Sequence, residues 1–168
     1  MEALPMMLVR AGVFIVAAGL ANVAAASCTD EPFLTCTTGS KTLSLCLGDG
    51  TATYTFGPAG NPEMVMTRPI REVDYVAWSG FGRYPTNQVV FRNHSYGYVI
   101  TSGYDRHEDG ECPYEVAILV ERDDRIVAHL SCRETFNANP LTPIWRAKEA
   151  AGQCWKIETR DWHDDCEE

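Results

Sequence analysis

The stretch that does most to decide the fold of this chain is YEVAILVERDDRIVAHL, from Tyr114 to Leu130. Apolar residues recur at every second position on both sides of Arg122-Asp123-Asp124, a pattern typical of two antiparallel strands that bury one face. With 122–124 as a three-residue loop, the apolar residues form three cross-strand pairs: Val116 with Leu130, Ile118 with Ala128, and Val120 with Ile126. We therefore predict a β-hairpin here, with His129 on its polar face.

A second hairpin is predicted shortly upstream. Placing Asn93 to Tyr96 in its loop aligns apolar residues across two strands on one face: Phe91 with Tyr98 and Val89 with Ile100. Asn93 suits the positive φ that such loops need. Both hairpins point to an antiparallel β architecture.

Other segments also have strand character. Residues 51–56 form a β-rich run that ends at the glycine- and proline-rich cluster 57–62, and a further strand is predicted over 73–78. A last strand is predicted from Cys154 to about Glu158, leading into a polar tail. Six or seven short strands separated by turn signals predict a mostly β chain, folded as a small antiparallel β-sandwich or barrel.

One short C-terminal helix is predicted beside these strands. Thr142 is placed as its N-cap, Pro143 suits the first turn, and residues 144–151 are good helix formers that end at Gly152. The fold class is thus a disulfide-stabilised β-sandwich or barrel with a single short helix.

The first 26 residues have the layout of a secretory signal peptide. One basic residue, Arg10, precedes an apolar run from Ala11 to Leu20, and the small residues Ala24-Ala25-Ala26 follow. The apolar run is shorter than the roughly 18 to 20 residues that span a bilayer, and no later run approaches that length. We expect residues 27–168 to form one exported β-rich domain, periplasmic or secreted, with a polar C-terminal tail and no transmembrane segment.

The chain is acidic, with a formal net charge of −9. A domain with this charge repels nucleic acid and anionic membrane surfaces, and it attracts cationic partners at long range. The charge therefore predicts no nucleic-acid binding and favours a protein or cell-envelope partner that is cationic.

Seven cysteines follow the leader: Cys28, Cys36, Cys46, Cys112, Cys132, Cys154 and Cys166. Because exported proteins meet an oxidising environment, we expect disulfides, and the odd count leaves at least one cysteine outside an intrachain pair. Local pairing predicts 36–46, 112–132 and 154–166, although the hairpin register above places Cys112 and Cys132 two residues out of step.

Two roles are open for Cys28. Ala25-Ala26-Ser27-Cys28 resembles a lipobox without its leucine, which would make this cysteine a lipid anchor. Ala24-x-Ala26 is an ordinary cleavage signal, which favours a disulfide role for Cys28 and leaves another thiol free.

No motif in the sequence indicates catalysis. A nucleophile elbow, a zinc-protease helix, a phosphate loop and a dinucleotide fingerprint are absent, and no cysteine pair has zinc-site spacing. The candidate bases are four histidines: His94, His107, His129 and His163. His107 lies in an acidic loop that lacks the alternating oxygen ligands of a calcium site. We predict a protein that is not an enzyme and has no metal and no cofactor.

Recognition is better supported by the segment SGFGRY, from Ser79 to Tyr84. Its glycines free the backbone, and its aromatic and arginine side chains are residue types enriched at binding hot spots. The candidate binding residues are Ser79, Phe81, Arg83 and Tyr84. The alternative is that the glycines form a bulge while Phe81 and Tyr84 fill the core.

The opening Cys28-x7-Cys36-x9-Cys46, followed by Tyr54-Thr-Phe56-Gly57 and a turn leading to Glu63, resembles a group of small uncharacterised exported bacterial proteins. That resemblance implies no activity, but it implies that Cys28 belongs to the disulfide framework.

The exported β-rich design and the Ser79-Gly80 loop are also similar to periplasmic lysozyme inhibitors, which insert a Ser-Gly-x-x-Tyr loop into the enzyme cleft. Here Tyr84 follows Ser79 by five positions rather than four. The hypothesis is a binding protein for a protein or envelope partner, with lysozyme inhibition as its most concrete form. The alternatives are a small envelope hydrolase or metal-dependent enzyme built on His107, and a structural envelope protein.

Overall fold

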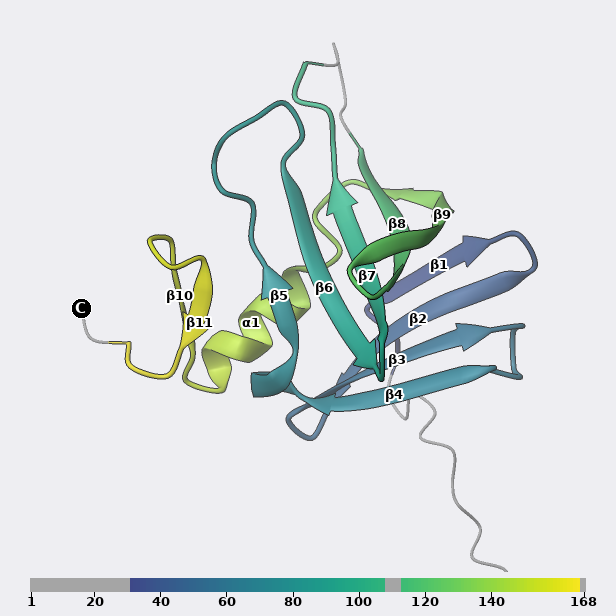
Figure 1. Ribbon diagram of the computed structural model, residues 1–168, viewed down its shortest axis with the longest axis horizontal. Helices are drawn as coiled ribbons and strands as arrows, with labels where there is room; N and C mark the ends of the chain where they lie inside the picture. The colour runs from purple at the N-terminus through teal and green to yellow at the C-terminus, as the bar shows by residue number, and fades with distance from the viewer. Residues whose placement is uncertain (1–30, 108–112, 167–168) are drawn as a thin grey trace, which may run out of the picture.

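Two antiparallel β-sheets pack face to face in the computed structural model, which describes residues 31–107 and 113–166 (Figure 1). The first sheet has four strands in chain order: β1 (Leu34–Thr38), β2 (Lys41–Gly48), β3 (Thr51–Gly57) and β4 (Met64–Pro69). The second has five: β5 (Asp74–Val76), β6 (Thr86–Asn93), β7 (Tyr96–Gly103), β8 (Tyr114–Arg122) and β9 (Arg125–Phe136). The predicted mostly β, antiparallel class is confirmed, and within the described residues the sheets form a sandwich rather than a closed barrel.

The remaining elements lie at one end of the sandwich. A short 3₁₀ helix, η1 (Ile70–Glu72), links the sheets, and α1 (Thr142–Ala150), the one α-helix of the described residues, follows β9. A small hairpin of β10 (Cys154–Lys156) and β11 (Asp161–His163) lies beside α1 (Figure 1).

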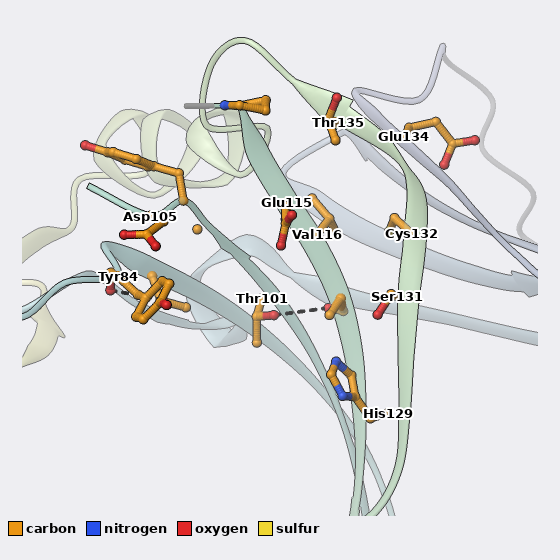
Figure 2. Close-up of a pocket in the computed structure, with 15 residues that line it drawn as sticks. Tyr84, Thr101, Asp105, Glu115, Val116, His129, Ser131, Cys132, Glu134 and Thr135 are labelled. Carbon is orange, nitrogen blue, oxygen red and sulfur yellow. Dashed lines mark hydrogen bonds between the residues drawn. The ribbon is translucent and has the colours of Figure 1, made fainter. Parts of the chain in front are cut away.

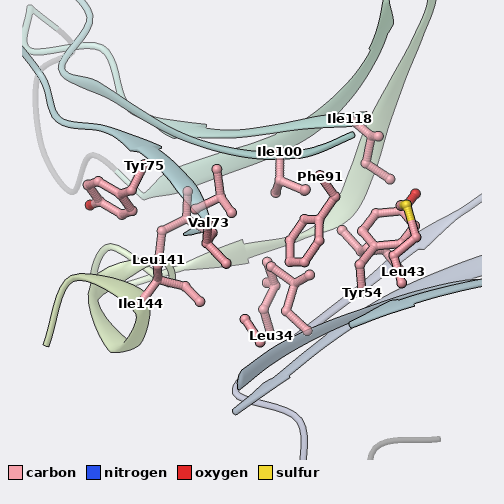
Figure 3. Packing of buried hydrophobic residues seen from close by; sticks show 14 of the residues in the cluster. Leu34, Leu43, Tyr54, Val73, Tyr75, Phe91, Ile100, Ile118, Leu141 and Ile144 are labelled. Carbon is pink, nitrogen blue, oxygen red and sulfur yellow. The ribbon is translucent and has the colours of Figure 1, made fainter. Parts of the chain in front are cut away.

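One hydrophobic core joins both sheets and the helix (Figure 3). Large buried side chains come from the strands, from the N-cap of α1 and from α1 itself: Leu34, Leu43, Tyr54, Phe91, Ile100, Ile118, Leu141 and Ile144. Tyr54 of β3 bridges the layers, with its ring centroid 5.5 Å from that of Phe91 and 5.7 Å from that of Tyr98. Because successive strand residues point to opposite faces, the period-two pattern of the sequence places these side chains inward.

The β6–β7 hairpin has the predicted pairing, but its turn is tighter than predicted. Phe91 pairs with Tyr98 and Val89 with Ile100, which confirms the register. Asn93 itself pairs with Tyr96, so the turn contains two residues, and the positive φ of 54° falls on His94 rather than on Asn93. Two-residue turns with positive φ match the right-handed twist of the strands that they join.

The predicted register of the β8–β9 hairpin is wrong by two residues. Ile118 pairs with Leu130, and Val120 pairs with Ala128. The turn is made by Asp123 and Asp124, with φ values of 50° and 59°, so Arg122 remains in the strand. A β-bulge between Val120 and Glu121 leaves one residue of β9 without a partner in β8, which changes the register between the turn and the rest of the hairpin. Sequence alternation alone could not locate this bulge, because a bulge shifts the pairing without changing residue types.

A second irregularity in β9 joins the two sheets. Residues 132–134 oppose the single residue Val116, and this part of β9 approaches β1. There Cys132 forms a disulfide with Cys36, and the Thr37 N–H donates to Glu134 Oε2 at 2.7 Å. The cross-link ties the edges of the two sheets.

The cysteine pairing therefore differs from local pairing. The predicted 36–46 and 112–132 bridges are wrong, since Cys36 bonds Cys132 across 96 residues, whereas the predicted 154–166 bridge is confirmed. Cys46 is also disulfide-bonded. Cys28 and Cys112 lie outside the described residues. Disulfides of this kind are typical of proteins that function outside the reducing cytoplasm.

Helix α1 is confirmed, with a different start. Leu141 occupies the N-cap position, and the Thr142 hydroxyl donates to the Asn139 carbonyl at 2.9 Å instead of capping the helix. Gly152, with φ of 83°, ends the helix because the N–H of Gln153 donates back to Lys148 and that of Gly152 to Glu149. This is the Schellman arrangement that glycine favours.

The polar segment after α1, up to residue 166, folds back against the sandwich. The predicted strand ends at Lys156, and a returning strand, β11, pairs with it. Trp162 packs its ring against Trp145 and Tyr75, and its Nε1–H donates to the Tyr75 carbonyl at 3.0 Å. The Cys154–Cys166 disulfide and Trp162 hold this polar segment against the sandwich.

Candidate binding surface

The loop from Ser79 to Tyr84, between β5 and β6, lies entirely at the surface. Phe81 is 84% exposed and Tyr84 is 57% exposed, so neither fills the core. The alternative of a core role for these rings is therefore wrong. Single apolar side chains are common on protein surfaces, whereas neighbouring exposed ones, such as Phe81 and Tyr84 on one loop, can mark an interaction site.

An ion pair holds the loop against the end of β7. The Arg83 Nε donates to both carboxylate oxygens of Asp105, at 2.7 and 2.9 Å, and its Nη2 also contacts Oδ2. The Arg106 N–H donates to the Arg83 carbonyl at 3.1 Å. A bidentate arginine–carboxylate pair fixes the relative orientation of the two side chains in addition to pairing their charges.

Further contacts order the tip of the loop. The Trp78 Nε1–H donates to the Phe81 carbonyl at 2.7 Å, and the Arg106 guanidinium lies 5.3 Å from the centroid of the Trp78 ring. Gly80 and Gly82 have φ values of 85° and 98°, which L-residues rarely adopt. The loop thus presents Phe81 and Tyr84 from a backbone that is already tied down, which lowers the entropy lost on binding.

The pKa of Asp105 provides a test of this anchor. Hydrogen bonds from Arg83 and from the His107 N–H lower the pKa of Asp105 from 3.8 to about 2. The ion pair is therefore complete above pH 3.8 and is lost as the pH falls through about 2. We expect Arg83→Gln to return the Asp105 pKa toward 3.8 in an NMR titration of its carboxyl carbon. Arg106→Gln is the control and should leave the pKa low; an unchanged pKa in Arg83→Gln would contradict the anchor.

A groove adjoins the loop on the outer face of the second sheet (Figure 2). It has a volume of about 640 Å³, within the range of ligand pockets. Its lining includes outward-facing residues of β7, β8 and β9 and residues next to the loop: Tyr84, Thr101, Tyr104, Asp105, Glu115, Ala117, His129 and Ser131. Figure 2 shows Tyr84 and Asp105 on one side and Ser131 on the other. The loop and the groove therefore form one continuous surface.

The histidines are scattered over the molecule. His94 is exposed in the β6–β7 turn, and His129 is exposed on the outer face of β9, as predicted. His163 Nε2 lies 2.8 Å from the Thr159 hydroxyl. His107 is exposed, and residues 108–112 of its acidic loop lie outside the described residues. Within residues 31–107 and 113–166, no group of three or more metal-ligating side chains could hold an ion.

Sequence reasoning identified the loop but missed its supports. Asp105, Trp78 and Arg106 have no motif of their own, and Arg83 and Asp105 are 22 residues apart in the chain. Only the side-by-side placement of the β5–β6 loop and the end of β7 brings them together.

No helix of the described part of the chain is long and apolar enough to cross a membrane. In comparisons with known proteins, no family model, no curated protein and no solved structure matches this chain.

Proposed function

We propose that this chain is an exported, periplasmic or secreted protein that binds a protein partner through the loop Ser79–Tyr84. The observation that carries the proposal is the exposure of Phe81 and Tyr84 on a loop anchored by the Arg83–Asp105 ion pair. Exposed aromatic rings on a preorganised backbone are typical of binding hot spots. The disulfides, the leader sequence and the net charge of −9 support export and a cationic partner.

Lysozyme is the most concrete partner for this surface. The loop is similar to that of periplasmic lysozyme inhibitors in its Ser79-Gly80 start, although Tyr84 follows Ser79 by five positions rather than four. Lysozymes are often cationic, so the acidic chain would also speed their encounter with it. The binding of a protein, without catalysis, is the activity assigned to the surface.

Loop substitutions test this proposal in an inhibition assay against a panel of lysozymes. Phe81→Ser removes a ring that is 84% exposed and so loses little packing within the fold, and stability should be close to that of the parent. We expect inhibition to weaken about 30-fold or more, the effect of losing a hot spot worth about 2 kcal/mol.

The matched control is Ile157→Ala, which alters a 72% exposed apolar residue in the β10–β11 hairpin and should leave inhibition unchanged. Inhibition that disappears at moderate salt, or that is equal in Phe81→Ser and the parent, would refute specific binding by the loop. Stoichiometric calcium or zinc in the purified protein would instead favour the metal-dependent enzyme.

A further inference from the structure

The side chains that line the groove beside the loop carry an excess of negative charge. Its lining contains three carboxylates, Asp105, Glu115 and Glu134, and neither lysine nor arginine. Asp105 is neutralised by Arg83, and Glu134 accepts the Thr37 N–H and points away from the groove (Figure 2). The Glu115 carboxylate is exposed and forms an ion pair with no side chain of residues 31–107 and 113–166. Among the described residues, Glu115 and Glu134 of the lining therefore have no ion-pair partner, and Glu134 is held by the Thr37 N–H.

The walls around Glu115 suit a long side chain with an apolar stem. Ala117 contributes apolar surface beside Glu115, and Tyr84 contributes an aromatic ring. Lysine and arginine place their methylenes against apolar surface while the charged end meets a carboxylate or a ring face.

An arginine of the protein makes both kinds of contact, with a carboxylate and with an aromatic ring, at the rim of the groove. The Arg83 guanidinium pairs with Asp105 and lies 5.3 Å from the centroid of the Tyr84 ring. A carboxylate and a tyrosine ring therefore already hold one arginine at this surface. Glu115 is a further carboxylate of the groove lining, and within residues 31–107 and 113–166 it forms no ion pair.

We propose that the groove binds a lysine or arginine side chain presented by the protein partner that contacts the loop Ser79–Tyr84. The inference rests on the proposed function, and it adds the chemistry by which the partner is recognised. Charge complementarity selects this occupant, because a carboxylate that meets an ammonium or guanidinium gains a charge-assisted hydrogen bond, whereas an anionic side chain would be repelled.

The experiment is an NMR titration of the full mature protein with arginine amide and, separately, with citrulline amide, an uncharged analogue of similar shape. We expect arginine amide to shift the backbone amides of Thr101, Gly103 and Ala117 in a saturable way, and citrulline amide to bind at least about tenfold more weakly. Glu115→Gln should weaken the binding of arginine amide by a similar factor. Glu149→Gln, which removes an exposed carboxylate on α1, should not.

Equal binding of the two amides, or unchanged binding in Glu115→Gln, would overturn the proposal, as would shifts spread over the acidic surface. The result is separable from the test of the loop. Lysozyme inhibition that is lost in Phe81→Ser but kept in Glu115→Gln would support the loop and refute the groove. Arginine amide binding that depends on Glu115, without inhibition of any lysozyme, would support the groove and refute lysozyme as the partner.

Discussion

Replacing Cys36 and Cys132 together with alanine is expected to lower the free energy of unfolding by about 4 to 5 kcal/mol. The bridge closes a loop of 96 residues, and the entropy that a cross-link removes from the unfolded chain grows with the length of that loop. The bridge also joins the edges of the two sheets, where β9 leaves its pairing with β8 and approaches β1. Urea denaturation of the parent and the double variant, fitted to a two-state transition, measures the difference.

The Cys154→Ala/Cys166→Ala double variant is the internal comparison. That bridge spans only 12 residues, so its loss should cost less, about 3 kcal/mol on the same chain-entropy model. A larger loss from the short bridge than from the long one would mean that packing of the C-terminal hairpin, rather than chain entropy, sets the effect.

Lys148→Met is the second substitution with a large expected effect, a loss of about 3 kcal/mol. Lys148 is only 1% exposed, and its ammonium donates to the carbonyl oxygens of Ile70, Arg71 and Val73 at 3.2, 3.3 and 2.9 Å. Methionine keeps most of the volume but removes the donors. Buried carbonyls that lose a partner each cost about 1 to 3 kcal/mol, and removal of the buried charge offsets part of that cost.

The matched control is Lys156→Met, which changes a partly exposed lysine that pairs with Asp165 at 3.5 Å. An exposed pair contributes less than about 1 kcal/mol, so this variant should be close to the parent in denaturant midpoint. Equal stability of Lys148→Met and Lys156→Met would contradict the role assigned to the buried ammonium.

The pH dependence supplies a second readout for the same residue. Burial lowers the pKa of Lys148 below its ordinary value of 10.5. Between the folded and unfolded pKa values the unfolded chain binds more protons, so the free energy of unfolding should rise with pH in that window. Lys148→Met should lack this contribution to the slope, which a comparison of the two proteins by denaturation at several alkaline pH values would measure.

Much of the second sheet could be predicted from sequence, whereas most of the first could not. The β6–β7 and β8–β9 hairpins show clear period-two alternation, which survives even where the register shifts. No strand was predicted for 34–48 or 64–69, although β1, β2 and β4 form there. In β2 the buried residues include the adjacent pair Leu45 and Cys46, which breaks simple alternation.

The sequence predicted one part of the candidate site, the loop, but not the other, the groove. Residue types enriched at interfaces marked the loop Ser79–Tyr84, but the same residues could equally have filled the core. The groove gave no sequence signal, because Tyr84, Glu115 and His129 reach it from three separate parts of the chain. Exposure and proximity are properties of the folded chain.

The sequence by itself determined the antiparallel β class, the two principal hairpins, the short helix and the disulfide between Cys154 and Cys166. Each depends on residues close in the chain, through alternation, turn chemistry or short loop closure. Tertiary structure alone decided the Cys36–Cys132 bridge, the burial of Lys148 and the anchoring of Arg83 by Asp105. Each joins segments at least 22 residues apart, and their approach depends on bulges and sheet packing that no local pattern encodes.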